Sequence, residues 1–436
     1  STWALMLTGK VLEPGPPGVA GTLRGMVRRL GEPVIRAAVG RAMREMGGQF
    51  VLGQDIGAAM ARARGKEAEG FTYSYDMLGE AAMTAADARR YTASYTNAIA
   101  AIARAAKAGD VAANPGISVK LSALHPRYEV AKTERVIAEL VPIVRSLARQ
   151  AAAAHMGLNI DAEEADRLGL SMEVIDRVLA DPALAGWNGF GVVVQAYGKR
   201  AGLVIDWLNE IAERLDRRIM VRLVKGAYWD TEMKLAQVEG HPGFPLFTTK
   251  PATDVSYLAN ARKLIGYGER LYPQFATHNA HTVAAIRHMV ADVPGLEYEF
   301  QRLHGMGERL YDIVMREENT RCRIYAPVGA HRDLLAYLVR RLLENGANSS
   351  FVNQIVDEDV SPEEIARDPI SDVKTEGTIR NLDHPSQIFA PRPNSMGFDL
   401  TEAEWLARID AARDVTVPDA EPLIAGAATG TARPVK

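Results

Sequence analysis

Two basic residues, Lys120 and Arg222, occupy positions where the sequence predicts buried β-strands. Strands of a parallel sheet are usually apolar on both faces, and a charge buried there needs a partner of opposite sign. Lys120 could form a structural ion pair, for example with Asp161, or it could bind an anionic ligand. We favour ligand binding for both Lys120 and Arg222, because perturbed charges concentrate at functional sites.

Other polar candidates stand at the carboxyl ends of the predicted strands. Glu80 follows the first strand, Asp161 ends the third, and Gln195 lies near the end of the fourth. The remaining candidates are Lys225 to Trp229, His278, Asn279, Gln301, His304 and Tyr325. We expect all of them at one rim, where barrel enzymes carry their chemistry.

A second constellation lies in the last predicted helix, 331–344. Tyr337, Arg340, Arg341 and Glu344 are spaced i, i+3, i+4 and i+7, which places them on one helix face. Two neighbouring guanidiniums suit a carboxylate or a phosphate, because each offers parallel donors. The alternative is a solvated helix surface with an Arg340 to Glu344 pair, and the spacing alone favours that alternative.

Four further motifs give weaker signals. Gly305-Met306-Gly307 lacks the third glycine of a dinucleotide-binding turn. His278 and His281 lack an evident third ligand, so no metal site is expected. Cys322 is expected to be a packed thiol rather than a nucleophile. Thr248-Thr249-Lys250 lies in a predicted long loop and is equally well interpreted as a surface segment.

Short β-rich runs alternate with amphipathic helical stretches from Phe71 onward. The predicted strands are 72–78, 117–121, 158–161, 191–196, 220–224, 275–278, 298–303 and 323–327. The predicted helices are 85–108, 134–154, 172–180, 203–215, 255–267, 281–290, 310–317 and 331–344. Eight strands, each followed by a helix, match a closed (β/α)8 barrel of the TIM type better than an open sheet.

The segments on either side lack this alternation. Residues 1–70 are predicted to form an N-terminal arm of turns and short helices, and residues 71–356 to form the barrel. Residues 357–436 contain an acidic stretch, a Pro-rich stretch and one predicted helix within 402–413. We expect this last segment to be a linker or tail without a core of its own.

Composition narrows the class of protein. The 436 residues include 51 basic and 54 acidic side chains, a formal net charge of −3. This balance offers no broad basic face, so nucleic acid is set aside as a partner. One cysteine cannot form an intramolecular disulfide, which fits a reducing, cytoplasmic compartment. Neither a long apolar run nor a leader peptide is evident, so membrane spanning and export are not expected.

Several long motifs resemble one known family. They are Ile117 to Tyr128, Arg222 to Trp229, Ala276 to Asn279, Arg323 to Gly329 and Tyr337 to Glu344. Over about residues 70–356 the chain is similar to the proline dehydrogenase module of bacterial proline utilisation A, with the motifs in the same order. The resemblance implies a distorted (β/α)8 barrel that holds non-covalent FAD. It also implies oxidation of L-proline to Δ1-pyrroline-5-carboxylate, the first step of proline catabolism, with electrons passed to a membrane quinone.

The resemblance also implies roles for individual residues. Lys120, Arg340 and Arg341 would hold the proline carboxylate, and Glu80 would pair with Arg340 across the mouth of the site. Asp161 would orient Lys120 or Tyr325. The pyrrolidine ring would be walled by Ala227, Tyr228, Leu303, Tyr325 and Tyr337.

The same match assigns a flavin shell. Its members would be Gln195, Arg222, Val224, Lys225, Gly226, Ala227, Trp229, Thr248, Thr249, Lys250, Thr277, His278, Asn279, Gln301, Glu344 and Ser350. A cationic Arg222 near the flavin would stabilise the reduced, anionic ring. Hydride transfer would run from proline C5 to flavin N5.

Longer family members carry an aldehyde dehydrogenase half, and some carry an N-terminal DNA-binding ribbon-helix-helix. The stretch Ile388 to Ser395 is similar to the lead-in to the aldehyde dehydrogenase half. We therefore expect this chain to be a fragment or excised domain that performs the first step alone. No amphipathic basic anchor is evident, so contact with the inner face of the cell membrane would be transient or made by missing parts.

Two other functions remain open on the sequence. Lys120 or Lys225 could attack a carbonyl, as in a Schiff-base lyase or aldolase. A non-catalytic barrel that binds carboxylates is the second alternative, and it predicts a colourless protein without turnover.

The arginine pair generates a first prediction. Replacing Arg340 or Arg341 by Met is expected to cost a few kcal/mol in kcat/KM for proline, because a charge-assisted contact would be lost from a desolvated site. Steady-state kinetics of each variant measure this, and unchanged kinetics would remove these arginines from the site.

Overall fold

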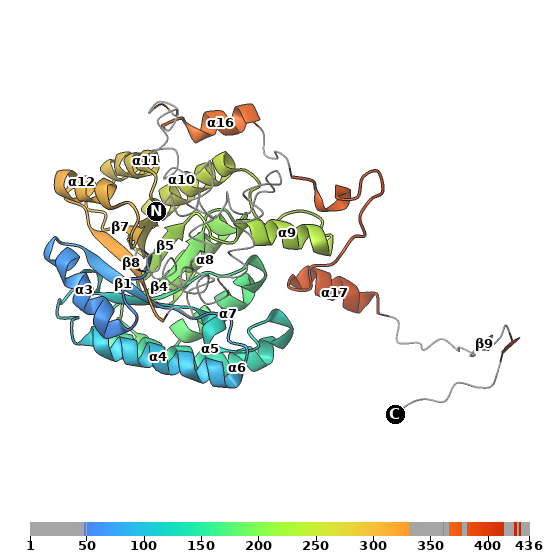
Figure 1. Cartoon of the computed structure of the whole chain (residues 1–436), viewed down its shortest axis with the longest axis horizontal. Coiled ribbons are helices and arrows are strands. Elements are labelled where there is room, and N and C mark those ends of the chain that lie inside the picture. The colour runs from blue at the N-terminus through green and yellow to red at the C-terminus, as the bar shows by residue number, and fades with distance from the viewer. Residues whose placement is uncertain are drawn as a thin grey trace, which may run out of the picture.

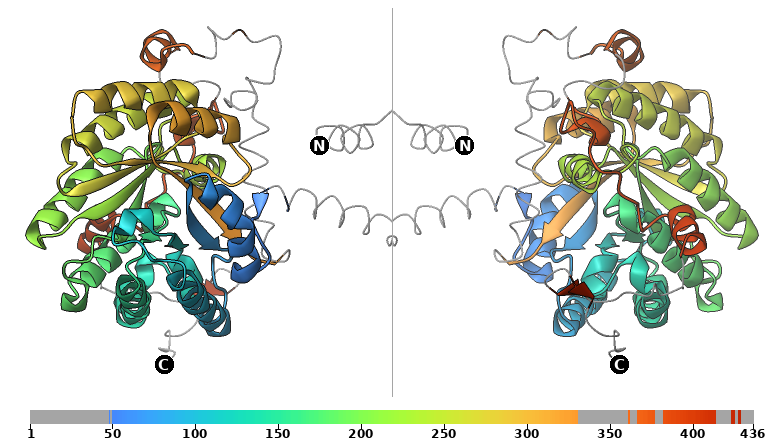
Figure 2. Two further views of the ribbon diagram at one scale, coloured as in Figure 1. Left: turned by 90° about the vertical axis from the view of Figure 1, so that its left-hand side faces the viewer. Right: turned by 90° about the vertical axis from the view of Figure 1, so that its right-hand side faces the viewer.

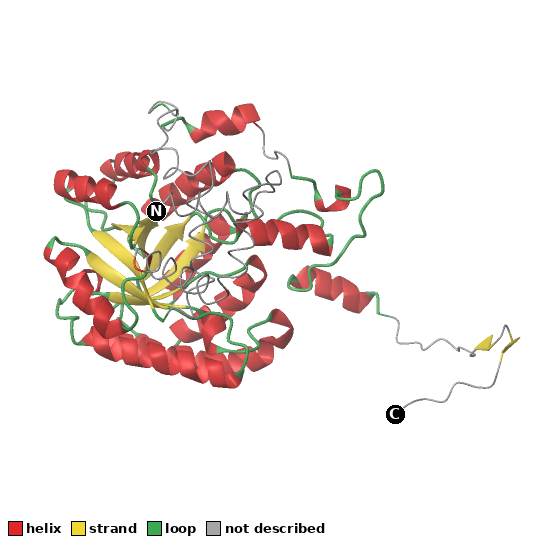
Figure 3. Cartoon of the chain, viewed as in Figure 1, coloured by secondary structure: helices red, strands yellow, loops and turns green. Residues whose placement is uncertain are grey.

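The structure is a computed structural model that describes residues 48, 50–330, 361, 366–376, 382–413, 423–424 and 427–428. Eight parallel strands form a closed barrel in chain order, and the pairing of the first strand with the eighth closes the ring. Helices surround the strands on the outside (Figure 3). The predicted (β/α)8 fold is confirmed.

The barrel strands are β1 Thr72–Met77, β2 Gly116–Val119, β3 Leu158–Ile160, β4 Phe190–Gln195, β5 Ile219–Val224, β6 Leu271–Ala276, β7 Glu299–Leu303 and β8 Cys322–Val328. The helices from α3 to α12 are α3 Ile56–Ala68, α4 Ala85–Ala103, α5 Leu121–Leu124, α6 Thr133–Ala153, α7 Leu168–Leu179, α8 Ala201–Arg214, α9 Trp229–Glu239, α10 Lys250–Gly266, α11 Ala280–Ala291 and α12 Glu308–Glu318. Beyond the barrel lie α16 Pro369–Glu376, α17 Ala403–Ala411, β9 Leu423–Ile424 and β10 Ala427–Ala428 (Figure 1).

Several elements differ in their bounds from the sequence prediction. The strand predicted for 117–121 is wrong at its end, because β2 stops at Val119 and Lys120 is the N-cap residue of α5. The strand predicted for 275–278 is wrong at both ends, because β6 is Leu271–Ala276. Pro273 lies within this strand, where its missing amide donor argued against an earlier start. The predicted long loop after β5 contains α9. The predicted helix 331–344 lies outside the described residues.

The start of α10 has a local cause. The Thr249 hydroxyl accepts the Ala252 amide at 3.4 Å, and Pro251 sits in the first turn, where its missing N–H costs nothing. These residues begin the helix at Lys250, so the interpretation of Thr248-Thr249-Lys250 as a surface loop is wrong for Lys250.

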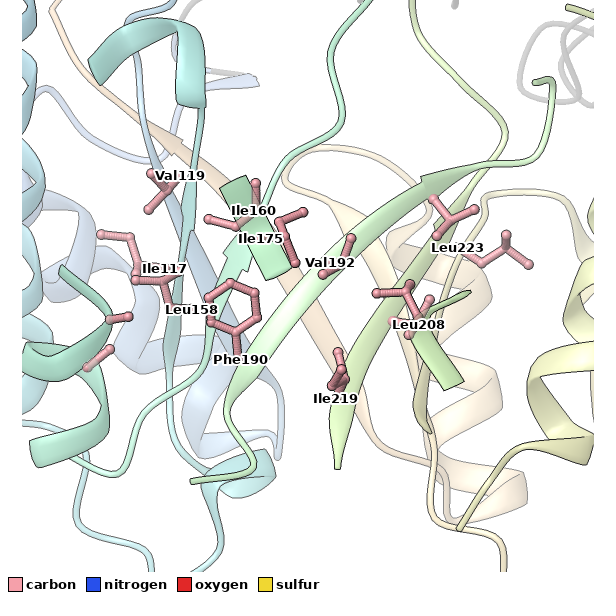
Figure 4. Close-up of a cluster of buried hydrophobic side chains, with 14 of the residues drawn as sticks. Ile117, Val119, Leu158, Ile160, Ile175, Phe190, Val192, Leu208, Ile219 and Leu223 are labelled. Atoms are coloured by element: carbon pink, nitrogen blue, oxygen red, sulfur yellow. The ribbon is translucent and has the colours of Figure 1, made fainter. Parts of the chain in front are cut away.

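The outward faces of the strands and the inner faces of the helices form the main hydrophobic core. Ile117, Leu158, Phe190 and Ile219 are fully buried. Figure 4 shows these side chains between the strands and the surrounding helices. Alternate residues of each strand point to opposite faces, so the residues between them face the barrel interior.

The barrel interior is polar. Asn159 of β3 donates to Gln274 of β6 at 2.8 Å, and Arg222 of β5 donates to Ser118 of β2 at 3.0 Å. Both bonds join strands that are not neighbours in the ring, so they cross the interior. Gly191 leaves room for the Asn159 amide, because a Cβ at Gly191 would clash with that side chain. The inward faces of these strands therefore carry polar side chains, unlike the apolar outward faces.

The segment before β1 packs on the barrel. The Leu52 amide donates to the Pro327 carbonyl at 2.9 Å, and Gly53 forms a bridge with Val328. Ala59 and Ala63 of α3 are fully buried in the main core. The described part of the predicted N-terminal arm thus covers the β8 side of the barrel.

The segment after the barrel runs over its outside, where Figure 2 shows α16 and α17. α16 packs beside α10. Arg200 at the start of α8 pairs with Glu402 at 2.8 Å, and Gln237 of α9 donates to the Asp383 carbonyl at 2.8 Å. α17 buries none of its side chains, and the assignment of 357–436 as a linker or tail stays a prediction.

A buried ion pair lies near the amino-terminal ends of β7 and β8. Arg323 Nε lies 2.7 Å from Glu299 Oε1, and the two side chains are at most 4% exposed. Arg323 also donates to the carbonyls of Ala112, Asn114 and Tyr73. Glu299 therefore neutralises a guanidinium that links β1, β7, β8 and the segment before β2.

Replacing Glu299 by Ala is expected to destabilise the protein by about 3–5 kcal/mol, because the buried Arg323 guanidinium would lose its counter-ion. Urea unfolding measures the change. Glu317→Ala removes a carboxylate from an exposed pair with Arg316 and is expected to change stability by less than about 1 kcal/mol. Equal effects of the two substitutions would contradict the role of Glu299.

Candidate active site

The carboxyl end of the barrel brings together a cluster of buried charges. Its members are Asp76 near the end of β1, Lys120 directly after β2, Asp161 directly after β3, Arg222 in β5 and Tyr325 in β8. Lys120, Arg222 and Asp76 are each at most 6% exposed. Four of these residues were predicted from the sequence, and Asp76 was missed.

Lys120 is held by three acceptors. Its Nζ lies 2.6 Å from Asp76 Oδ1, 3.1 Å from Asp161 Oδ2 and 3.3 Å from the Tyr325 hydroxyl. An ammonium has three N–H donors and no acceptor, so all three groups are suitable partners for it. The ion pair with Asp161 considered from the sequence exists, and Asp76 is a second and closer partner.

Arg222 is fixed by four side chains. Its Nη1 donates to Asp161 Oδ1 at 3.0 Å and to Ser118 Oγ at 3.0 Å. Its Nη2 donates to Ser74 Oγ at 3.2 Å, and its Nε donates to Gln301 Oε1 at 2.6 Å. The guanidinium thus has one orientation relative to the rim.

Tyr325 links the two cations. Its hydroxyl donates to Asp161 Oδ2 at 2.8 Å, and the Arg222 guanidinium lies 5.1 Å from its ring centroid. Asp161 therefore orients both Lys120 and Tyr325 in this structure. Cation–ring contacts of this kind add attraction where water is excluded.

The buried charges shift the pKa values in the cluster. Burial alone would lower the pKa of Lys120, but the acidic groups of Asp76, Tyr325 and Asp161 raise this pKa well above its usual value. Burial, together with the charges of Asp161 and Asp76, raises the pKa of the Tyr325 hydroxyl. Lys120 is therefore an ammonium and Tyr325 a neutral phenol at neutral pH. This argues against the Schiff-base alternative for Lys120, because a nucleophilic lysine needs a lowered pKa.

Glu163 in the loop after β3 forms hydrogen bonds with Ser122 and Gln195 beside the cluster. Glu163 accepts the Ser122 amide at 3.0 Å and a short hydrogen bond from the Ser122 hydroxyl. Gln195 at the end of β4 donates to the Glu163 carbonyl at 2.8 Å. Burial raises the pKa of Glu163 to about 7, although the hydrogen bonds from Ser122 oppose this shift.

Gln301 connects Arg222 at the rim with Glu299 near the amino-terminal end of the barrel. Its Nε2 donates to Glu299 Oε1 at 2.7 Å while its Oε1 accepts from Arg222. The carboxylate of Glu299 thus fixes which end of the Gln301 amide faces Arg222, since a carboxylate can only accept.

A second group of predicted residues lies at the end of β5 and in the first turn of α10. Lys225 and Lys250 both pair with Asp254, Lys250 at 2.8 Å, and their charges lower the pKa of Asp254 although its burial opposes this. The α10 N-terminus begins beside them at Thr249. Two ammonium groups next to a helix N-terminus form a donor set that suits phosphate oxygens.

The turn between β5 and α9 requires glycine. Gly226 has φ +138°, and a Cβ there would clash with the ring of Tyr197. Ala227 follows in this turn, Tyr228 is the N-cap residue of α9, and Trp229 Nε1 donates to the Phe247 carbonyl at 2.9 Å.

Residues after β6 and β7 face each other. The Leu303 amide donates to His278 Nε2 at 3.0 Å, so this ring nitrogen carries no proton. Asn279 caps α11 by accepting the Thr282 amide at 3.1 Å. Thr277 accepts the Asn279 amide through its hydroxyl at 3.2 Å.

The remaining predicted residues lie in loops, at a strand end or outside the described part of the chain. Tyr337, Arg340, Arg341, Glu344 and Ser350 lie outside the described residues. Glu80 and Thr248 lie in loops after β1 and before α10. Val224 ends β5, and its carbonyl accepts the Ala196 amide at 2.8 Å.

The residues that the sequence analysis missed carried a usable signal. Asp76 and Ser74 alternate with tyrosines along β1, and Ser118 and Glu299 lie two positions before Lys120 and Gln301. Alternation of polar and apolar residues indicates a strand with one polar face. The expectation of strands apolar on both faces hid this signal.

Two cavities bear on the place of the site. A small cavity of about 70 Å³ beside the rim is lined by Asp161, Glu163, Gln195 and Tyr197 among others. A larger one of about 640 Å³ is lined by Trp187, Arg218 and Tyr272, at the amino-terminal ends of the strands. The chemistry of barrel enzymes lies at the opposite end, so we place the candidate site at the rim.

The described residues also bear on a cysteine nucleophile, a metal site and a membrane-spanning helix. Burial raises the pKa of Cys322, as expected of a packed thiol. The described residues contain no group of three or more His, Cys, Asp or Glu side chains arranged to hold a metal ion. Likewise, no helix in the described ranges is both long and apolar enough to cross a bilayer.

A closed (β/α)8 barrel with its polar cluster at the carboxyl rim is the arrangement of barrel enzymes. A family model described as proline dehydrogenase matches residues 59–354. The chain belongs to the proline dehydrogenase family, which confirms the predicted family and enzyme class. Residues 1–50 match a second model, described as the DNA-binding domain of proline dehydrogenase. That match gives no support to the prediction that nucleic acid is not a partner, which stays a prediction.

Individual relatives agree with the family. Bifunctional protein PutA of Salmonella typhimurium is 51% identical over 431 residues, covering 94% of this chain and 32% of that protein. Proline dehydrogenase of Deinococcus radiodurans is 25% identical over 326 residues, 74% of this chain and 93% of that protein. A crystal structure of a variant of Bradyrhizobium japonicum proline utilization A has a TM-score of 0.81 at 48% identity, covering 94% of this chain and 42% of that one. The chain spans about a third of the length of the bifunctional relative.

The raised pKa of Glu163 generates a prediction about stability. Between its usual pKa of 4.5 and its folded pKa of about 7, the folded state binds more protons than the unfolded state, so stability falls as pH rises. Glu163→Gln is expected to remove a fall of up to about 3 kcal/mol across this window. Urea unfolding at pH values from about 4 to 8 measures it.

Glu173→Gln, at a more exposed position of α7, is the matched control for loss of a carboxylate. If wild-type protein and Glu163→Gln show parallel stability curves, Glu163 does not titrate as its burial implies.

Proposed function

We propose that this chain oxidises L-proline to Δ1-pyrroline-5-carboxylate with a non-covalently bound FAD. The supporting observation is the rim cluster of Lys120, Asp161, Arg222 and Tyr325 in a chain of the proline dehydrogenase family. In this proposal the rim binds the substrate on the side of β1, β2, β3 and β8, and the cofactor on the side of β5, β6 and β7.

The substrate carboxylate would be bound by Lys120 together with Arg340 and Arg341. The described cluster pairs two carboxylates, Asp76 and Asp161, with two cations, Lys120 and Arg222, and so is neutral overall. A further anion therefore needs additional positive charge, because a buried unpaired charge is costly. The two arginines of the 331–344 segment would supply it, with Glu80 pairing with Arg340 at the mouth.

The apolar part of the substrate would lie against aromatic and aliphatic side chains. Those proposed are Ala227, Tyr228, Leu303, Tyr325 and Tyr337. Tyr325 is fixed by its bond to Asp161, so its ring can wall the substrate in one position. Anchoring the carboxylate while the ring is confined orients the reacting carbon, and such positioning can be worth roughly 7–11 kcal/mol.

The residues between β5 and α10 fit a flavin dinucleotide. Lys225, Lys250 and the α10 N-terminus offer positive charge for the diphosphate, and Gly226 lets the connecting turn pack against the Tyr197 ring. Gln195, Arg222, Val224, Ala227, Trp229, Thr248, Thr249, Thr277, His278, Asn279, Gln301, Glu344 and Ser350 would complete the shell. When bound, the flavin would supply the redox chemistry by accepting hydride at N5 from proline C5.

The protein's own residues would prepare that transfer. The proline nitrogen must present a free lone pair, so its extra proton must leave before C5 is oxidised. Lys120 and Arg222 keep their charges through their buried carboxylate partners, and a cationic Arg222 favours an electron-rich ring beside it.

Partners and location follow the bifunctional relatives. We propose a membrane quinone as electron acceptor, reached by transient contact at the inner face of the cell membrane, and otherwise a cytoplasmic location. An aldehyde dehydrogenase half in the same polypeptide would consume the product. The name of the Salmonella typhimurium relative, a bifunctional protein, supports the last point.

One spectrum tests the proposed function. The purified protein is expected to be yellow and to bleach when L-proline is added without oxygen. A colourless protein, even after incubation with FAD, would favour the carboxylate-binding alternative, and trapping of a carbonyl substrate with borohydride would favour the lyase.

Arg222 generates a kinetic prediction. Arg222→Met is expected to slow flavin reduction by proline on the order of 10–100-fold, while proline binding weakens less, because the charge acts on the developing reduced ring. Stopped-flow reduction over a range of proline concentrations separates the two quantities. Equal losses in rate and binding would contradict this role.

A further inference from the structure

Asp76 makes the shortest polar contact of Lys120 and lies outside every motif that carries the family resemblance. It is fully buried, and its Oδ1 lies 2.6 Å from Lys120 Nζ. The two residues are 44 positions apart in the sequence: Asp76 lies in β1, and Lys120 directly follows the neighbouring strand β2.

The other groups around Lys120 are shared with different partners. Asp161 divides its oxygens among Lys120, Arg222 and Tyr325. By contrast, Asp76 Oδ2 has no hydrogen-bond partner within the described residues. Of the two carboxylates, Asp76 is therefore the one that forms no described ion pair with Arg222.

The Lys120 main chain is held from the same side. Its backbone amide donates to the hydroxyl of Tyr95 on α4 at 3.2 Å. Among the described residues, the titratable or charged groups that face Lys120 are thus Asp76 from β1, Tyr95 from α4, Asp161 after β3 and Tyr325 from β8. Arg222 from β5 reaches the cluster through Asp161.

We propose that Asp76 is a positioning residue of the proline dehydrogenase site: its carboxylate anchors the Lys120 ammonium and supplies the negative charge that keeps Lys120 cationic toward a substrate carboxylate. This inference rests on the proposed function. A buried ammonium without a full counter-charge loses its proton more easily, since burial disfavours the charged form.

The test uses Asp76→Asn, which keeps the shape and one oxygen acceptor but removes the charge. The probe is cyclopentanecarboxylate, a proline-sized acid without an amine, which stays ionised above about pH 7. Its pH dependence of binding therefore reports groups of the protein. Calorimetry on the flavin-loaded full chain between about pH 7 and 10.5 measures the affinity.

In Asp76→Asn the affinity is expected to fall toward the alkaline end of this range, where the wild-type affinity stays level because the pKa of Lys120 lies above the range. At pH 7 the affinity need not fall, because a negative charge near the bound carboxylate has also been removed. Asp76→Ser, which is smaller and neutral, gives the same expectation if the Asn variant does not fold.

Two controls separate positioning from general loss of structure. Asp76→Asn combined with Lys120→Arg is expected to lose the alkaline fall, because a guanidinium does not deprotonate in this range. Asp206→Asn breaks a matching Asp–Lys–Tyr group on α8 and α10, where Asp206 lies 2.6 Å from Lys263 and 3.0 Å from the Tyr267 hydroxyl. It is expected to leave the profile unchanged.

Superimposable profiles of wild-type protein and Asp76→Asn would overturn the inference, as would a weakening that is equal at every pH. The proposed function fails separately, if wild-type protein loaded with FAD is not reduced by proline. Since the calorimetric profile needs no turnover, each failure can be recognised without the other.

Discussion

The burial of the Lys120 ammonium is the constraint on which the rest of the site depends. Removing such a charge from water costs several kcal/mol, and only close partners of opposite sign offset that cost. The barrel provides them by placing Asp76, Asp161 and Tyr325 around one nitrogen. These partners come from separate strands and loops, so the charge is stable only when the ring is closed. The same closure places the Lys120 ammonium at the carboxyl rim.

Hydrogen bonds in the polar interior connect the two ends of the barrel. Glu299 neutralises Arg323 near the amino-terminal end of the barrel and also binds the Gln301 amide. Gln301 in turn accepts from Arg222 at the rim. The Glu299–Arg323 ion pair and the Arg222 guanidinium thus belong to one hydrogen-bond network. A buried polar group in this network that lost one of its partners would cost more free energy than an apolar side chain in its place.

The two sides of the rim have different chemical characters. Around Lys120, carboxylates and a phenol balance the cations, which suits a small substrate that brings its own charge. At the end of β5 and the start of α10, Lys225 and Lys250 share Asp254, and a helix N-terminus lies beside them. Gly226 keeps the connecting turn close to Tyr197. This division agrees with an enzyme whose cofactor carries the redox chemistry while the protein supplies position and field.

The sequence by itself determined the eight-fold alternation, and it predicted Lys120, Asp161 and Arg222 at the carboxyl rim, where the structure brings them together. It left the boundary after Val119, the helix α9 and the partner Asp76 undetermined. Periodicity shows that a residue faces the interior, but it does not show which residue stands opposite, because that depends on how β1 pairs with β2 and β8. Only the closed barrel decides which charges meet, since its interior contacts join residues far apart in the chain.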